Sequence, residues 1–273
     1  MRFKNYSSVF LIFYLFGSFI PNCFGQILAI DREMGYDSVS HGFNGAIDLA
    51  FSADKQRKNI IELTQQSELD WIIRPTNVLI VLTHTDFVFN GPTVLENNGY
   101  FQLRYRDNDT KKLAPDYFLQ YQWNGITGLQ NRALAGMNAR FRFWDDCKDD
   151  LYASAGLFYE YENWNPFLSN YAFGGVGLNE VERNLIRLNF SIKTAFQISK
   201  GIDFSAISYL QTPLNAGVKN LVTPRWMLDS QVNFQINKHL MFNLKYNFNL
   251  DYFRPLPIDP FFYSLTLGVR IQS

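Results

Sequence analysis

Beyond its first 25 residues the sequence lacks an apolar run long enough to cross a bilayer as a helix, which takes about 20 residues. Its 25 basic and 25 acidic side chains cancel, so no overall field would draw the protein to nucleic acid. The 3 histidines and 2 cysteines form neither a CxxC pair nor a cluster with metal-ligand spacing. We therefore disfavour membrane-spanning helices, nucleic-acid binding and a metal centre, and we expect no cofactor.

The start of the chain has the composition of an export signal. A basic start is followed by an apolar stretch over residues 9–20 and by small residues at a cleavage site. Because the apolar stretch is too short for an uncleaved anchor, we expect a signal peptide over residues 1–25 and a mature protein that begins near Gln26. Cys23 is not preceded by the small residue expected before a lipid-modified cysteine. After cleavage Cys147 would be the last cysteine, which excludes an internal disulfide.

Apolar and polar side chains alternate with a period of two along many segments, which explains how 17% aromatic residues coexist with a mean hydropathy of only -0.15. From Ile186 to Ser199 the apolar residues occupy one set of alternate positions, and residues such as Arg187 and Lys193 occupy the other. This pattern predicts β-strands, in which successive side chains point to opposite faces. The segments exceed the length of about 5 or 6 residues usual in soluble sheets, and they suit tilted strands that cross a bilayer.

About twelve such segments follow one another, and an even number lets both termini of a closed barrel lie on the same side of the membrane. We therefore predict an all-β fold, a transmembrane antiparallel up-and-down β-barrel over residues 41–273 with both termini in the periplasm. Residues 26–40 would form a periplasmic N-terminal lead-in. The predicted strands are 43–52, 59–71, 77–89, 99–106, 117–124, 133–144, 151–162, 186–199, 202–212, 226–237, 240–251 and 261–271.

The predicted connections alternate in length, as expected of a bacterial barrel with short periplasmic turns and longer outside loops. The turns around Lys200 and Lys238 are short and fall at even connections, whereas segments 163–182, 213–224 and 252–260 are long and fall at odd ones. The first connection breaks the rule because it is short. Aromatic belts place tryptophan at membrane interfaces, and four tryptophans lie near strand ends: Trp71, Trp123, Trp144 and Trp226.

A soluble barrel such as a lipocalin is the main alternative fold. In such a barrel the apolar faces point inward and the polar faces meet water. The polar faces of this chain are rich in Asn and Gln but poor in Lys and Glu, which is unusual for a water-exposed surface and typical of a crowded lumen. The composition therefore favours apolar side chains against lipid and polar side chains inside.

The predicted lumen carries charges of both signs. Rings of such charges select ions or anionic solutes in a narrow pore. Alternatively, opposite charges pair across a lumen that side chains nearly fill, and the neighbouring Arg140/Arg142 and Glu160/Glu162 segments favour such pairing. The candidate lumen residues are Arg104, Arg106, Arg140, Arg142, Glu160, Glu162, Arg187, Lys193, Asp229, Lys245 and Arg270, together with Glu62, Glu68 and Asp70.

Candidates for catalysis are few. His84 and Asp86 lie two residues apart, so both would point to one face of a strand. A serine from a neighbouring strand would turn them into a site for lipid hydrolysis, but no nucleophile motif accompanies them. The acidic turn 145–150 lacks the spacing of a calcium loop. We therefore predict no catalytic, cofactor-binding or metal site. The long segment 163–182 is a separate feature: it either binds external ligands, plugs the lumen or packs over its mouth.

Three stretches in the middle of the chain carry a family resemblance: 124–136, 140–142 and 155–162. They resemble a bacterial family known as salt-stress-induced outer-membrane proteins of unknown function, in which an Arg-x-Arg strand pairs with a Gly-Leu-x-Tyr-Glu strand. The resemblance implies an outer-membrane barrel and supplies no catalytic residues. The segment 263–271 looks like the terminal strand recognised by the barrel-assembly machinery, although the chain does not end in Phe.

These features predict a non-enzymatic protein of the outer membrane of a Gram-negative bacterium, either a narrow small-solute channel or a component that maintains the envelope. The expected partners are outer-membrane lipids, the barrel-assembly machinery during biogenesis, and a small solute. Two alternatives stay open: a subunit of a larger outer-membrane complex, and a membrane lipid hydrolase centred on His84.

Overall fold

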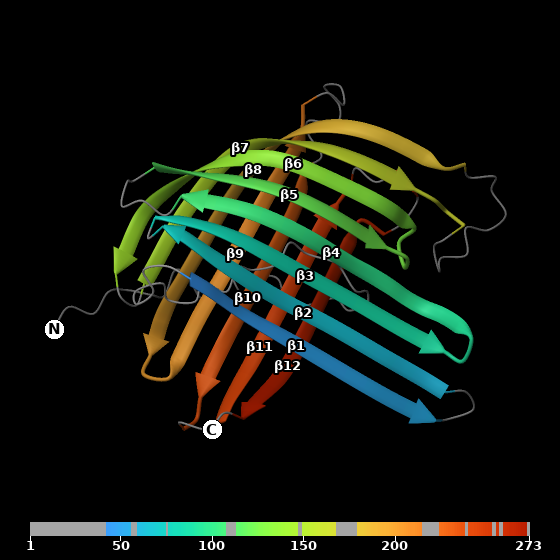
Figure 1. Cartoon of the computed structure of the whole chain (residues 1–273), viewed down its shortest axis with the longest axis horizontal. Coiled ribbons are helices and arrows are strands. Elements are labelled where there is room, and N and C mark those ends of the chain that lie inside the picture. Colours follow the sequence, from blue (N-terminus) through green and yellow to red (C-terminus); the bar gives the residue numbers. More distant parts are fainter. Residues whose placement is uncertain are drawn as a thin grey trace.

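The computed structural model contains twelve β-strands over its described residues (Figure 1). The described residues are 42–55, 59–74, 76–107, 113–146, 149–167, 179–214, 224–237, 240–252, 255–256 and 259–271. The strands are β1 (Gly42–Lys55), β2 (Asn59–Arg74), β3 (Asn77–Asn90), β4 (Thr93–Asp107), β5 (Leu113–Asn124), β6 (Leu129–Asp146), β7 (Asp149–Trp164), β8 (Val181–Ser199), β9 (Ile202–Pro213), β10 (Arg225–Gln235), β11 (Leu240–Asp251) and β12 (Phe261–Ile271).

Each strand pairs with its neighbours in the sequence, and all of these pairings are antiparallel. The predicted all-β, up-and-down architecture is therefore confirmed. Figure 1 shows the sheet curving over itself, with β6 to β8 at the top of the view. The curvature brings Phe262 of β12 into one apolar cluster with Leu129 of β6 and Trp164 of β7. Over the described residues, strand pairing runs from β1 to β12 without joining these two end strands.

The two faces of the sheet have opposite character. On the concave side, called the interior below, β5 buries Asp116, Gln120 and Gln122. On the convex side, called the outer face, apolar side chains are exposed, as the strict alternation of exposed and buried residues along β5 illustrates. The polar face predicted for the lumen is thus the buried one. Large apolar side chains exposed on the outer face include Phe43, Ile47, Leu49, Phe51, Leu119, Met137, Leu157, Ile192, Leu265 and Leu267.

Because consecutive strands are antiparallel, the connections after even-numbered strands lie at one end of the sheet and those after odd-numbered strands at the other. We call these the short-connection end and the long-connection end. The short-connection end has the connections 75–76, 108–112, 147–148, 200–201 and 236–239. The predicted long loops occur at the other end as 165–180, 214–224 and 252–260, but the first three connections there are short: 56–58, 91–92 and 125–128.

Strand β4 begins at Thr93, earlier than the sequence pattern predicted. Gly91 has a φ of 61°, a left-handed conformation that suits glycine, and the tight turn it forms pairs Asn90 with Thr93. The register then shifts between Val88 and Phe89. Such an irregularity interrupts the two-residue period, which is why the first part of β4 was not recognised in the sequence.

Several predictions fall on parts of the chain outside the described residues. These are the signal peptide 1–25, the lead-in 26–40, Cys147 and residues 168–178 of the longest loop. The acidic turn 145–150 coincides with the adjoining ends of β6 and β7, where Asp146 is paired with Asp149. No helix in the described part of the chain is long and apolar enough to cross a membrane.

Large apolar side chains form a layer on the part of the interior wall made by β5, β6 and β7, which we call the apolar layer. Phe118, Leu134 and Phe158 form one cluster, and the ring centroids of the two phenylalanines are 6.0 Å apart. Gly136 lies opposite Phe158 and leaves room for it. A Cβ atom on Gly136 would lie 2.8 Å from the carbonyl oxygen of Leu157 and would also meet the Phe158 side chain. The close approach of the two strands therefore requires glycine at this position.

We predict that Gly136→Val lowers the stability of the folded protein by about 1–3 kcal/mol, because an added side chain in a filled interior displaces its neighbours. The measurement is urea-dependent unfolding of the refolded protein, followed by tryptophan fluorescence. Ala135→Val is the matched control, since Ala135 lies on the exposed outer face and should tolerate the larger side chain. Equal midpoints for Gly136→Val and the wild type would contradict the account of this close approach.

Candidate functional site

A group of buried charges lies in the interior toward the long-connection end. It draws side chains from five strands, and Glu160, Glu162 and Arg187 within it are all 0% exposed. Charges without water are stable only when other charges or hydrogen-bond donors solvate them. We call this group the ion-pair cluster; its members are Arg132 (β6), Glu160 and Glu162 (β7), Arg183 and Arg187 (β8), Arg225 (β10) and Asp251 (β11).

Glu162 accepts hydrogen bonds at both carboxylate oxygens. Its Oε1 lies 2.5 Å from Nη2 of Arg132 and 3.2 Å from Nη2 of Arg225. Its Oε2 accepts from Nε of Arg183 and, at 3.1 Å, from the indole N–H of Trp164. Three guanidinium groups and one indole thus replace the water that this carboxylate loses on burial.

Arg225 ties opposite sides of the curved sheet together. Its Nη1 donates to Glu160 Oε1 at 2.9 Å, and its Nε donates to Asp251 Oδ2 at 2.8 Å. Glu160 also binds Arg132 at 3.2 Å and the Nε of Arg187. Since Asp251 is on the adjacent strand β11 while Glu160 is on β7, Arg225 bridges strands that are not neighbours in the sheet. The arginine therefore spans the interior.

An apolar group lies between the ion-pair cluster and the long-connection end. Leu129, Trp164, Leu256 and Phe262 are all buried and in contact, and we call them the apolar cap. Leu256 belongs to the connection between β11 and β12, and its side chain is buried in this group at the mouth of the interior. The cap keeps water from the cluster, and ion pairs strengthen as the local dielectric falls.

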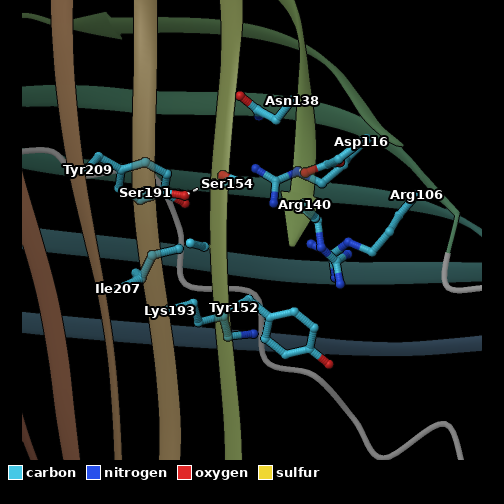
Figure 2. Close-up of a pocket in the computed structure, with 12 residues that line it drawn as sticks. Arg106, Asp116, Asn138, Arg140, Tyr152, Ser154, Ser191, Lys193, Ile207 and Tyr209 are labelled. Atoms are coloured by element: carbon cyan, nitrogen blue, oxygen red, sulfur yellow. Dashed lines mark hydrogen bonds and ion pairs between the residues drawn. The ribbon is translucent and has the colours of Figure 1, made fainter. Parts of the chain in front are cut away.

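The opposite half of the interior holds a small cavity that is partly open to solvent, which we call the basic pocket (Figure 2). Its charged lining residues are Arg104 and Arg106 of β4, Asp116 of β5, Arg140 of β6 and Lys193 of β8. Nε of Arg104 lies 3.7 Å from Oδ1 of Asp116. The remaining lining residues are Asn138, Tyr152, Ala153, Ser154, Ser191, Ile207 and Tyr209.

The pairing of β6 with β7 orders these features along the strand direction. Arg132 is opposite Glu162 in the ion-pair cluster, Gly136 is opposite Phe158 in the apolar layer, and Arg140 is opposite Ser154 in the basic pocket. The layer of Phe118, Leu134 and Phe158 thus lies between the two charged regions. The interior consists of an apolar cap, a cluster of ion pairs, an apolar layer and a basic pocket, in that order.

The structure divides the predicted lumen residues between these regions. Arg104, Arg106, Arg140 and Lys193 line the basic pocket, and the guanidinium of Arg142 lies 5.3 Å from the ring centroid of Tyr152 beside it. Glu160, Glu162 and Arg187 belong to the ion-pair cluster. The others lie elsewhere: Glu68 and Asp70 are buried on β2, Glu62 is exposed, Asp229 and Lys245 are half-buried on β10 and β11, and the side chain of Arg270 is outside the described residues.

The predicted pairing of Arg140 and Arg142 with Glu160 and Glu162 is wrong. Arg140 is opposite Ser154 and Arg142 is opposite Tyr152, so both lie on the far side of the apolar layer from the two glutamates. The antiparallel register fixes this separation. Charge pairing in the interior does occur, but with other arginines.

Sequence reasoning missed Arg132, Arg183, Arg225 and Asp251. For Arg132 the signal was incomplete, because counting back equally from the β6–β7 turn places Ala133 opposite Glu162. The register shift between Arg142 and Trp144 moves the pairing by one residue, to Arg132. In the pairing of β7 with β8, Arg183 is also opposite Glu162. Arg225 lies one residue before the predicted strand 226–237. Asp251 falls on the polar side of the predicted strand 240–251 but was not included among the lumen charges.

His84 and Asp86 share a face as predicted, and Nε2 of His84 lies 2.6 Å from Oδ2 of Asp86. The ring of His84 stacks on Tyr100, with centroids 5.7 Å apart. The residues opposite this pair in the sheet are Gln66 and Tyr100 for His84, and Thr64 and Asn98 for Asp86. None of these four is the serine that the hydrolase hypothesis requires. Within the described ranges, no group of three or more His, Cys, Asp or Glu residues is arranged to hold a metal ion.

We predict that Glu162→Gln lowers the free energy of unfolding by about 3–5 kcal/mol, because it leaves buried guanidinium groups without their counter-charge. Chemical unfolding monitored by tryptophan fluorescence measures the difference. Glu182→Gln is the matched control, since it is the same substitution at an exposed position of β8. A loss no larger than that of the control would show that the cluster does not hold the strands together.

Comparison with known proteins gives one family match. The model of a family described as "Protein of unknown function, DUF481" matches residues 90–255, which is more than half of the chain. The matched range includes every member of the ion-pair cluster and every lining residue of the basic pocket. No curated protein matches the sequence. Among solved structures, the NanC porin in a rhombohedral crystal form is similar, with a TM-score of 0.47 and 11% identity over 84% of this chain and 100% of the porin chain. On the family match, the chain belongs to the DUF481 family of proteins of unknown function.

Proposed function

We propose that the protein is a non-enzymatic β-barrel of the bacterial outer membrane that passes small solutes through a narrow polar interior. The observation that carries the proposal is the distribution of side chains between the two faces. Residues such as Leu119, Met137 and Ile192 are exposed on the outer face, while the interior buries amides and charges. A soluble sheet has the opposite arrangement, with polar side chains facing water. An apolar outer face is instead suited to the hydrocarbon of a membrane.

A membrane location also requires that the backbone groups of β1 and β12 find partners, because an unpaired amide or carbonyl in hydrocarbon costs several kcal/mol. Pairing of these two strands would satisfy both edges at once and close the sheet into a barrel. Their outer faces are suited to lipid, since Ile47 and Leu49 of β1 and Leu265 and Leu267 of β12 are among the most exposed apolar side chains. The expected partners are then outer-membrane lipids and, during biogenesis, the barrel-assembly machinery.

The filled interior supports a narrow path rather than a wide pore. The apolar cap and the ion-pair cluster occupy the long-connection end, and the basic pocket leaves space at the other. Small barrels of this kind are largely filled by their own side chains. The same filled interior supports a second candidate function, in which the barrel is closed and maintains the integrity of the envelope. A measurement of conductance in planar bilayers distinguishes a channel from such a closed barrel.

We predict that the mature protein is recovered in the outer-membrane fraction and that its gel mobility changes on heating. Leu119→Arg should reduce the folded fraction, since a charge facing the bilayer midplane costs about 2–4 kcal/mol. Gln66→Arg is an instructive control, because Gln66 is only half-buried on the interior side of β2, where the same charge avoids lipid. Recovery from the soluble periplasmic fraction, without a heat-dependent mobility change, would exclude the membrane location.

In planar bilayers we expect small unitary conductance steps from the wild type. Leu256→Ser should enlarge the steps, because it weakens the apolar cap at the mouth of the interior. Leu214→Ser is the matched control, since Leu214 is exposed at the same end and should leave conductance unchanged. Electrical silence of both wild type and Leu256→Ser would exclude a channel and favour the closed barrel.

A further inference from the structure

The basic pocket differs from the ion-pair cluster in its balance of charge. Four basic side chains line it, Arg104, Arg106, Arg140 and Lys193, against the one carboxylate of Asp116. In the ion-pair cluster, by contrast, four guanidinium groups meet three carboxylates. Net positive charge in a partly enclosed space attracts anions, because field lines concentrate between walls of low dielectric.

Acidic residues on the surrounding strands do not remove this excess. Asp70 of β2 is opposite Ile80, which is in turn opposite Arg104, so one strand separates it from the pocket. On β7, Asp150 lies two residues before Tyr152 of the pocket wall, and the guanidinium of Arg142 of β6 lies beside the Tyr152 ring. Asp229 of β10 is opposite Ile207 of the pocket wall and interacts with Lys245 of β11. With these five included, six basic side chains face four carboxylates.

The groups that line the pocket are of the kind that bind oxyanions. Figure 2 shows the side chains of Arg106 and Arg140 reaching toward one another from β4 and β6. The guanidinium of Arg140 lies 5.0 Å from the ring centroid of Tyr152, which orients its planar fork. The hydroxyls of Ser154 and Ser191, 2.6 Å apart, supply further donors on the neighbouring wall. Guanidinium forks match the geometry of phosphate and carboxylate oxygens.

We infer that the basic pocket binds the oxyanion group of a small solute, a phosphate or a carboxylate, as the solute moves through the interior. This inference deepens the proposed function and rests on it, because a solute reaches the pocket through the interior of the folded barrel. The pocket lies on the short-connection side of the apolar layer, whereas the ion-pair cluster lies on the other side. Anions that pass the cluster are therefore held next at the pocket.

Direct binding is tested with the mature chain refolded in detergent without lipid, by calorimetric titration with inorganic phosphate at low ionic strength. Arg106→Gln and Arg140→Gln should each weaken phosphate binding by about tenfold, a change that corresponds to about 1.4 kcal/mol. Lys200→Gln removes the same charge from an exposed turn and should leave the affinity unchanged. Because no lipid is present, any binding comes from the free ion rather than from a headgroup.

Arg140→Lys keeps the charge but loses the planar fork, so its affinity should lie between those of the wild type and Arg140→Gln. It also serves if a glutamine variant does not fold, as judged by the heat-dependent change in gel mobility. Lys193→Gln supplies a further test on β8, a strand that contributes no arginine to the pocket. Phosphate binding that is absent in the wild type, or equal in the wild type and all four pocket variants, overturns the inference.

Reversal potentials in bilayers under a potassium phosphate gradient separate this inference from the proposed function. Anion preference in the wild type that falls in Arg106→Gln but not in Lys200→Gln supports both. Conductance without anion preference, together with no phosphate binding in detergent, overturns the pocket and leaves the channel. Electrical silence with wild-type phosphate binding overturns the channel and leaves the pocket as a binding site.

Discussion

The geometry of an extended strand sends successive side chains to opposite faces, and this constraint determines both surfaces of the protein. In β5, for example, Tyr117, Leu119 and Tyr121 are exposed while the residues between them are buried. A sheet that curves over itself then collects every second side chain of twelve strands in one interior. Because many of those side chains are amides and charges, they are stable there only where they bind one another or water.

Much of this organisation could be predicted from the sequence, because the two-residue period is local. The order of the strands, their antiparallel sense and the identity of the polar face follow from it. The start of β4 was missed because the irregularity near Val88 interrupts the period. The partner of Glu162 was misassigned for a different reason. Arg140 is on the correct face, but the partner depends on the distance from the turn and on the register shift between Arg142 and Trp144, which together place Arg132 there.

Contacts across the interior could not be predicted at all. The bonds from Arg225 to Glu160 and Asp251 depend on how tightly the sheet curves, and no local pattern records that curvature. The apolar cap is similar, since Leu256 comes from a connection while Leu129 and Trp164 come from strands on the other side. The features that distinguish this interior from a generic one are therefore the non-local ones.

The arrangement around Arg225 also has a consequence for how the strands find their alignment. A slip of one residue in β10 would turn its guanidinium toward the outer face and leave Glu160 and Asp251 buried without it. Strand pairing alone penalises such a slip weakly, because the backbone hydrogen bonds re-form one step along. The buried charges thus favour one alignment of β6, β7, β8, β10 and β11, because a slip of any one of these strands separates buried ion pairs.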